Sequence, residues 1–352
     1  MKTRVDLVWD SGAFSAWRKG IRLNLKKYMN HLERFESISE GYVGMDVIPG
    51  NPGMPRTPQQ TEESASAGWK NHMAMRKAGF EPIPVYHFGE RRYWLEKMLG
   101  EGFKYIGIGG VARAAAGCRK EWLDGLFGYL GGDKGYPDVK VHGFGMTSVP
   151  LMFRYPWFSC DSMSYQLMSA YGWILVPKLL PDGSYDYTRT WYQMGVSKGS
   201  SRGEGGIHGQ VLKTGNHISL VGKRQRDHVI GWLESQGFDI EQAATSDKVR
   251  TAINLRFFRM AEKTYKPAPF FYRRQGLWCE QSGHGRRTPV GEFRILYTLN
   301  ICRILSDVLE DEGVRNRLMS YFYFVDSDPF DIKEYVRTGR FPNIKRRVRL
   351  EK

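Results

Sequence analysis

The sequence predicts an α/β fold in which a parallel sheet occupies the first half of the chain. Short, nearly continuous apolar runs alternate with amphipathic stretches through residues 1–180, which is the pattern of buried parallel strands connected by helices. Polar residues and glycines follow six of these runs, and in an α/β barrel the carboxyl ends of the strands form the active site. We therefore expect an α/β barrel followed by a basic, mostly helical C-terminal half.

Six segments are predicted to be strands because each is a short run rich in apolar residues. They are Val5–Trp9, Tyr42–Ile48, Ile83–Phe88, Tyr105–Gly109, Lys140–Phe144 and Trp157–Cys160. Helices are expected between them at Ile21–Phe35, Thr61–Ala78, Arg91–Leu99 and Arg119–Leu130. Six units do not close an eight-stranded barrel. Trp173–Val176 is therefore predicted as a seventh strand, and Phe293–Leu299 or Tyr321–Val325 as an eighth, although either of the last two could be helical.

Residues 1–180 are predicted to form the barrel core, and the composition of the chain changes after them. Residues 181–228 are rich in Gly, Ser, Tyr, Lys and Arg, which favours a basic insertion or an irregular hairpin. Residues 229–352 are expected to form a helical C-terminal region, with helices at Val229–Ser235 and Val249–Lys263, that completes the barrel and binds nucleic acid.

The chain is strongly basic, with 52 Lys and Arg against 37 Asp and Glu and a net charge of +15. Such an excess favours a polyanionic partner, most simply nucleic acid, and a basic protein without such a partner is the alternative. Each candidate phosphate contact could instead belong to a solvated surface. The candidates are Arg202, Lys223, Arg224, Arg226, Arg286 and Arg287.

Several classes of protein are not expected from this sequence. It has no apolar run long enough for a membrane-spanning helix, and its N-terminus lacks the apolar core of a signal peptide. The four cysteines include no Cys-x-x-Cys pair, so neither a metal site nor a disulfide framework is predicted. A reduced, cytoplasmic protein is the resulting expectation.

Two carboxylates, Asp10 and Asp161, each follow an apolar strand and precede a serine. If the strands lie in barrel order, both side chains point into one mouth. A pair of carboxylates across one substrate suits glycosidic chemistry, in which one attacks the anomeric carbon and the other moves protons. The alternative for either residue is a helix cap or an Asx-turn. Cys160, beside Asp161, is expected to be buried, because neighbours on a strand point to opposite faces.

The run Asp10-Ser11-Gly12-Ala13-Phe14-Ser15 resembles the Asp-Ser-Gly-Gly-Phe/Tyr-Gln motif of tRNA-guanine transglycosylases. Met45-Asp46, Ile108-Gly109-Gly110 and Cys160-Asp161 follow in the order of that family. The segments DSGAFSAW, PVYHFGE, IGIGG, VHGFG and SCDS are most similar to the phage-type relatives that put 7-deazaguanine bases into DNA. The resemblance covers about residues 5–175 and implies a TIM-like barrel.

This resemblance implies a role for each matching residue. Asp161 matches the nucleophile that attacks C1′ of the nucleoside, and Asp10 matches the general acid/base. Phe14 matches the aromatic residue that stacks on the base, and Asp46 the carboxylate that pairs with the base edge. The remaining base-binding candidates lie in the same motifs or at the corresponding strand ends: Ser11, Gly12, His87, Phe88, Gly109, Gly110 and His142.

The implied reaction replaces guanine in DNA by a free 7-deazaguanine base, without a cofactor, and its implied use is to protect phage DNA from host nucleases. The Cys-x-Cys-x-x-Cys zinc motif of the tRNA enzymes has no counterpart here, and Ser162-Met163-Ser164-Tyr165 replaces their Pro-Thr-Arg. Both departures favour DNA over tRNA. Two alternatives stay open, namely the same reaction on tRNA and a non-catalytic nucleic-acid-binding protein on the same fold.

Overall fold

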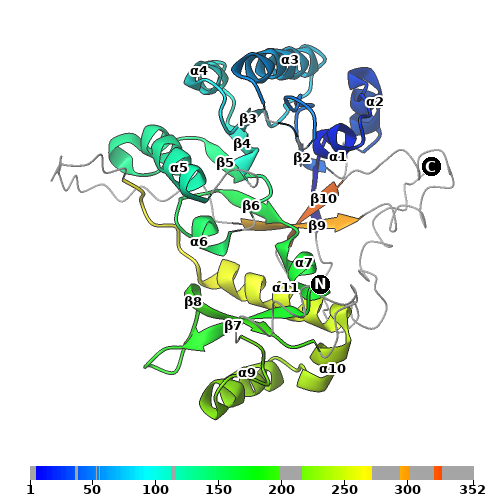
Figure 1. The fold of residues 1–352 in the computed structure, drawn as a ribbon. Coiled ribbons are helices and arrows are strands. Elements are labelled where there is room, and N and C mark those ends of the chain that lie inside the picture. Colours follow the sequence, from blue (N-terminus) through cyan, green and yellow to red (C-terminus); the bar gives the residue numbers. More distant parts are fainter. Residues whose placement is uncertain are drawn as a thin grey trace. The chain divides into compact units, whose positions relative to one another are not determined.

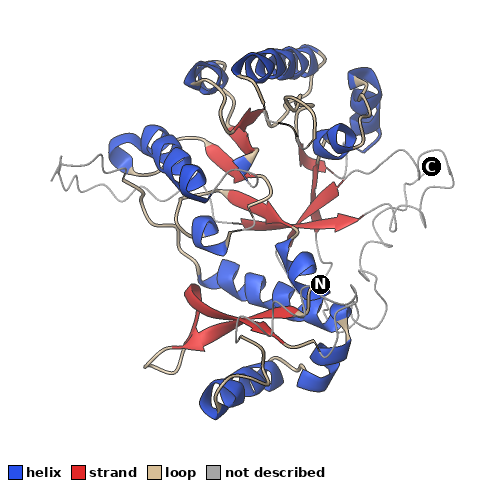
Figure 2. Ribbon diagram, in the orientation of Figure 1, coloured by secondary structure: helices blue, strands red, loops and turns tan. Residues whose placement is uncertain are grey.

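The computed structural model describes residues 5–35, 39–52, 54, 56–111, 116–146, 148–197, 216–271, 294–300 and 321–326. Their contacts divide the chain into two compact units. Among these residues, the first unit contains everything up to Ser162 together with residues 267–271 and two C-terminal strands, and the second contains Met163–Lys266. Figure 1 labels the elements of both units, and Figure 2 distinguishes their helices and strands.

The first unit contains an eight-stranded sheet in the order β2-β1-β10-β9-β6-β5-β4-β3. Strand β10 is antiparallel to both of its neighbours, β1 and β9, whereas all the other pairs are parallel. The bounds are β1 Val5–Trp9, β2 Ser39–Tyr42, β3 Val85–His87, β4 Tyr105–Gly109, β5 Lys140–Gly143, β6 Ser159–Ser162, β9 Arg294–Asn300 and β10 Tyr321–Asp326.

The two end strands of this order, β2 and β3, are linked by a parallel bridge between Val43 and Ile83. The Gly44 N–H donates to the Ile83 carbonyl at 2.8 Å, and the Ile83 N–H donates to the Tyr42 carbonyl at 2.8 Å. Val8 and Ile83 are buried together, and Tyr105 and Phe144 pack against them. Side chains from the β1, β3, β4 and β5 segments therefore share one apolar cluster.

Helices connect the parallel strands and flank the sheet of the first unit (Figure 1). They are α1 Ala13–Arg18, α2 Leu25–Phe35, α3 Pro58–Lys77, α4 Arg92–Gly100, α5 Ala116–Gly131 and α6 Val149–Met152, with a 3-10 turn at Gly132–Lys134. Thr57 and Gln60 form a capping box at the start of α3, which satisfies two backbone donors that the first turn leaves unpaired.

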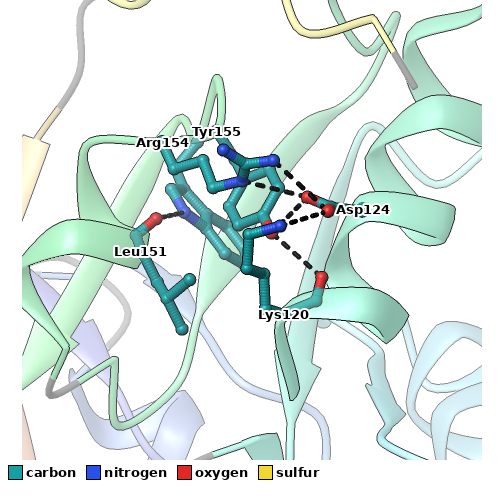
Figure 3. Close-up of polar contacts among 6 residues, drawn as sticks. Lys120, Asp124, Leu151, Arg154 and Tyr155 are labelled. Carbon is teal, nitrogen blue, oxygen red and sulfur yellow. Dashed lines mark hydrogen bonds and ion pairs between the residues drawn. The ribbon is translucent and has the colours of Figure 1, made fainter. Parts of the chain in front are cut away.

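A polar cluster ties α5 to the segment that follows α6. Asp124 accepts hydrogen bonds from Arg154 Nε at 3.0 Å, Lys120 Nζ at 3.0 Å and the Tyr155 hydroxyl at 2.7 Å, as Figure 3 shows. Burial alone would raise the pKa of Asp124, but the bonds from Arg154, Tyr155 and Lys120 outweigh it and lower the pKa. The ionised carboxylate thus anchors the helix that leads from β4 to β5.

The second unit is built on a hairpin and four helices in the described part of the chain. Strand β7 (Trp173–Leu179) pairs antiparallel with β8 (Tyr185–Gly195), and the helices are α7 Ser164–Ala170, α9 Lys223–Ser235, α10 Ile240–Thr245 and α11 Asp247–Thr264. Asn254 on α11 is fully buried; it accepts from the Leu175 N–H at 2.8 Å and donates to Ser169 Oγ at 3.0 Å. This side chain joins α11 to both β7 and α7.

Most strands form where the sequence predicts them, but the predicted strand Tyr42–Ile48 is wrong. Strand β2 is Ser39–Tyr42, and beyond the bridge at Val43 the Asp46 N–H bonds to the Gly44 carbonyl at 2.9 Å, so that this segment bends instead of continuing the strand. Val5–Trp9 and Tyr105–Gly109 are confirmed as β1 and β4, and both candidates for an eighth strand, Phe293–Leu299 and Tyr321–Val325, coincide with strands of the sheet. The prediction that Trp173–Val176 is a seventh strand of that sheet is wrong, because β7 pairs with β8 in a separate two-stranded sheet. No helix of the described residues is long and apolar enough to cross a membrane.

The start of α2 differs from the predicted helix Ile21–Phe35 for a local reason. Asn24 Oδ1 accepts a hydrogen bond from the Lys27 N–H at 3.0 Å, and α2 begins at Leu25. Asparagine is a strong N-cap residue because its side chain satisfies a free N–H of the first turn. The residues between α1 and Asn24 therefore form an exposed connection rather than the first turn of the helix.

Candidate active site

Three carboxylates from different strands interact electrostatically in the first unit. Asp10 directly follows β1, Asp46 lies in the segment after β2, and Asp161 is part of β6. The charges of Asp46 and Asp161 both act on Asp10 and raise its pKa. The structure therefore brings together the three acids that the motifs single out, although β10 and β9 lie between β1 and β6 in the sheet order.

Asp10 has the properties of a group that exchanges protons near neutral pH. Burial is the main reason that its pKa is raised from 3.8 to about 7, and the charges of Asp46 and Asp161 add to this effect. Backbone hydrogen bonds from Gly12 and Ser11 act in the opposite direction. Gly12 has a φ of 73° at the N-cap of α1, a left-handed conformation that glycine adopts without strain.

Asp161 is held by a backbone donor from the turn that follows the neighbouring strand β5. Its Oδ1 accepts a hydrogen bond from the Gly145 N–H at 2.6 Å and lies 3.3 Å from His142 Nε2. The other nitrogen of His142 contacts Ser159 Oγ at 2.8 Å, and Ser159 Oγ in turn contacts the Tyr105 hydroxyl at 2.5 Å. The buried His142 ring is therefore fixed in orientation behind Asp161.

Asp46 is held by a histidine that bridges two carboxylates. His87 Nε2 lies 2.9 Å from Asp46 Oδ2, and His87 Nδ1 lies 2.9 Å from Glu90 Oε1. Burial lowers the pKa of His87, but the hydrogen bonds and charges of Asp46 and Glu90 outweigh it and raise the pKa to about 10. His87 is thus an imidazolium at neutral pH and donates to both carboxylates. Ser11 Oγ donates to the other oxygen of Asp46 at 3.4 Å.

Two glycines at the end of β4, Gly109 within the strand and Gly110 after it, are required for different reasons. A Cβ at Gly109 would lie 2.8 Å from His87 Cδ2 and 3.0 Å from Val85 Cγ1, closer than carbon atoms normally approach. Glycine at this position therefore leaves room for the His87 ring. Gly110 has a φ of +76° and lies against the backbone of Phe88, so the turn itself requires glycine there.

The two phenylalanines of the motifs occupy different environments. The Phe14 side chain on α1 is 45% exposed, and its ring centroid lies 5.9 Å from that of Trp17. Phe88 is half-buried and packs against Trp122 at 5.2 Å between ring centroids. Of the two, Phe14 has the larger surface available to a planar base. Ser11 is buried, and its Oγ also accepts the Ala13 N–H at 3.3 Å.

Sequence analysis missed three residues that contact or act on this cluster, namely Glu90, Tyr28 and His72. The Tyr28 hydroxyl donates to the Val43 carbonyl at 2.7 Å, and burial together with the charges of Asp10 and Asp46 raises its pKa well above 10. His72 is buried, and this lowers its pKa to about 4, so that it is neutral. The signal for Glu90 was present, since it lies three residues after His87 at the end of a buried strand.

The candidate phosphate contacts that the structure describes lie in the second unit. Lys223 forms an ion pair with Asp227 at 2.6 Å, and Arg224 is exposed. Arg226 donates to the carbonyls of Ile218, Ser219 and Val221, so this guanidinium stabilises the turn before α9. Arg202, Arg286 and Arg287 lie outside the described residues.

No group of three or more His, Cys, Asp or Glu side chains in the described ranges is arranged to hold a metal ion. Cys118 is exposed, whereas Cys160 is fully buried as predicted, and burial raises its pKa well above 9. Such a thiol is a packing group rather than a nucleophile. Cys279 and His284 lie outside the described residues.

Comparison of the chain with models of protein families, with curated proteins and with solved structures gives no match. No relative therefore supplies a function. The function is therefore inferred from the three carboxylates and from the groups that contact them.

Proposed function

We propose that the protein is a DNA-guanine transglycosylase that exchanges guanine in DNA for a 7-deazaguanine base. The observation that carries the proposal is the difference between Asp10 and Asp161. Asp10 has a pKa near 7 partly because of the charge of Asp161, whereas Asp161 accepts a short backbone hydrogen bond. Two interacting carboxylates with separate environments are what a reaction needs when one group handles protons and the other attacks as an anion.

We also propose that the eight-stranded sheet is a closed, TIM-like barrel. The bridge between Val43 and Ile83 supports closure, because it links the two end strands of the sheet order. The antiparallel β10 makes this barrel atypical. In such a barrel Asp10, Asp46 and Asp161 all project from the carboxyl ends of parallel strands, where barrel enzymes carry out their chemistry.

In the first half-reaction the Asp161 carboxylate attacks C1′ of a deoxyguanosine. The bond between C1′ and N9 breaks, and its electron pair leaves with the guanine. The protonated Asp10 gives its proton to the departing base, which leaves as neutral guanine. The product is an ester between Asp161 and the deoxyribose, together with ionised Asp10.

In the second half-reaction the ionised Asp10 accepts the N9 proton of the incoming 7-deazaguanine. The N9 electron pair then attacks C1′ and displaces the Asp161 carboxylate. Asp10 ends protonated and Asp161 ends ionised, so both return to their starting forms. One glycosidic bond is broken and one is formed, and the exchange therefore needs no cofactor.

Asp46 is proposed to recognise the base. Guanine and 7-deazaguanine both present N–H donors on one edge, and an ionised carboxylate can accept two of them. The His87 imidazolium holds Asp46 in place through its contact with Asp46 Oδ2. A base paired in a duplex cannot reach such a site and must be flipped out or supplied by a single strand. The exposed ring of Phe14 is suited to stack on the flipped base.

DNA is the proposed substrate because the chain lacks the zinc motif of the tRNA enzymes that it otherwise resembles. The proposed role is protection of phage DNA from nucleases, in the cytoplasm of the host. The test is mass analysis of nucleosides from DNA and RNA of cells that express the protein and are supplied with a 7-deazaguanine. We expect the modified deoxynucleoside in DNA with the wild type and none with Asp161→Asn. Modification confined to RNA would identify a tRNA enzyme, and modification in neither would contradict the proposal.

A further inference from the structure

An exposed basic segment begins directly after Asp10. Residues 11–32 contain no Asp or Glu and five cations, which we call the α1–α2 basic strip: Arg18, Lys19, Arg22, Lys26 and Lys27. All five side chains are exposed. The strip includes the end of α1, the connection to α2 and the first turn of α2. It is the densest run of unbalanced charge in the described part of the first unit.

The strip borders the carboxylate site. Tyr28, on the first turn of α2, donates through its hydroxyl to the Val43 carbonyl at 2.7 Å, three residues before Asp46. Its pKa is raised by burial and by the charges of Asp10 and Asp46, so this turn lies close to both acids. Trp17 on α1 donates through Nε1 to the Gly50 carbonyl at 2.6 Å, which fixes α1 against the segment that carries Asp46. The helices α1 and α2 lie beside one another in Figure 1. The cations on the exposed faces of α1 and α2 therefore lie at the edge of the carboxylate site.

Four of the five cations are not used to balance acidic side chains of the described residues. Arg18, Arg22, Lys26 and Lys27 form no ion pair with a carboxylate in the ranges that the structure describes. Large apolar side chains are exposed among them, with Phe14 at 45%, Ile21 at 56% and Leu23 at 39%. Cations interleaved with exposed apolar and aromatic groups are typical of surfaces that bind single-stranded nucleic acid.

We propose that the α1–α2 basic strip binds the phosphate backbone of the DNA strand on either side of the base delivered to Asp10. The inference rests on the proposed function for the identity of the strand. Continuity with the carboxylate site favours DNA over an anionic membrane, because a membrane contact has no need to adjoin three clustered acids. The basic residues at the start of α9 are less suited, since Lys223 is paired and Arg226 binds carbonyls.

The test is fluorescence anisotropy of the full chain with a labelled, guanine-containing single-stranded DNA at several salt concentrations. In the variant Arg18→Gln/Arg22→Gln/Lys26→Gln we expect affinity at low salt to fall by about tenfold or more, and the slope of log K against log salt to flatten by about 2. The conservative variant Arg18→Lys/Arg22→Lys keeps the charge and should bind almost as the wild type does.

The matched control is Lys70→Gln/Lys77→Gln/Lys104→Gln, which removes the same charge from exposed positions on α3 and before β4. Its affinity should stay within about twofold of the wild type. Equal losses in both triple variants would overturn the proposal, as would an unchanged salt slope in the strip variant. So would loss of binding to phosphatidylserine vesicles with unchanged binding to DNA. Strip-dependent DNA binding without base exchange would support the surface while contradicting the proposed reaction.

Discussion

The carboxylate of Asp161 adds to the effect of burial in raising the pKa of Asp10, although β10 and β9 lie between β1, which Asp10 follows, and β6, which contains Asp161. Asp46 has the same effect on Asp10 from a third strand segment. Asp10 is therefore protonated in part at neutral pH, while Asp161 is held by the Gly145 N–H. This relationship supports separate roles in the proposed double displacement, with Asp10 as the proton donor and Asp161 as the nucleophile.

The first prediction concerns stability against pH. The folded protein holds the Asp10 proton up to about pH 7, whereas the unfolded chain releases it near 3.8. The native state therefore binds more protons between these values, so this group makes the free energy of unfolding fall as pH rises from about 4 to about 7. Asp10→Asn removes the effect. It should be roughly 1–3 kcal/mol more stable than the wild type at about pH 8 and equally stable at about pH 4.

Urea unfolding of both proteins at the two pH values measures this difference. The control is Asp138→Asn, at an exposed ion pair with Lys134, and it should change stability by less than about 0.5 kcal/mol at either pH. An Asp10→Asn protein that is less stable than the wild type at the higher pH would show that the Asp10 carboxylate is not destabilised in the folded state.

The second prediction concerns Glu90, whose carboxylate contacts Nδ1 of His87. The folded pKa of His87, about 10, lies above its ordinary value of 6.5. Its partners therefore contribute stability that is complete below about pH 6.5 and is lost as pH rises through about 10. Glu90→Gln weakens this contribution, so we expect a loss of roughly 1–3 kcal/mol at about pH 6 and a smaller loss at about pH 10.

Unfolding at the two pH values and an NMR titration of His87 provide the readouts for Glu90→Gln. The NMR pKa of His87 should fall in the variant. The matched control is Glu96→Gln, which breaks an exposed i, i+4 pair with Arg92 and should cost less than about 0.5 kcal/mol. An unchanged His87 titration would mean that Glu90 does not set its protonation.

The third prediction concerns Gly109→Ala. The added Cβ would lie 2.8 Å from His87 Cδ2, so the ring must shift, which disturbs the contact of its Nε2 with Asp46. Base exchange should fall by roughly tenfold to a hundredfold, because a displacement of about 1 Å in a positioning group has effects of this size. The control is Gly125→Ala within α5, where nothing lies within 4 Å of the new Cβ. Equal activity of the two variants would show that His87 does not position Asp46 for base exchange.

Most strands of the first unit were predictable because each is a local apolar run; β2 was not, because Ser39–Tyr42 contains Glu40 and Gly41 and the apolar residues follow it. The same reasoning could not foresee that β9 and β10 separate β1 from β6, since pairing between distant segments leaves no local pattern. It also assigned Trp173–Val176 to the main sheet, because an apolar run gives a strand but not its partner. Strand β7 instead pairs with β8, a segment that the composition marks only as an insertion or hairpin.

The acids of the candidate site were predictable from the sequence, but most of the residues that contact them were not. Asp10, Asp46 and Asp161 stand out because each follows a buried strand within a recognisable motif. The bridge from Asp46 through His87 to Glu90 depends on tertiary contacts, and Tyr28 acts from a helix whose sequence gives no sign of its neighbours. The basic cluster around Arg226 suggested a phosphate contact, but the guanidinium of Arg226 donates to three backbone carbonyls, which the sequence does not indicate.

The measurement that tests the central claim most directly is the capture of a covalent complex between Asp161 and DNA. The wild-type protein is mixed with guanine-containing single-stranded DNA in the absence of an incoming base, and the mixture is resolved on a denaturing gel. We expect a complex that survives denaturation with the wild type, none with Asp161→Asn, and slower formation with Asp10→Asn. Asp10→Asn keeps the nucleophile and loses only the proton donor. A denaturation-resistant complex that forms at the wild-type rate with Asp161→Asn would contradict the account at its central residue.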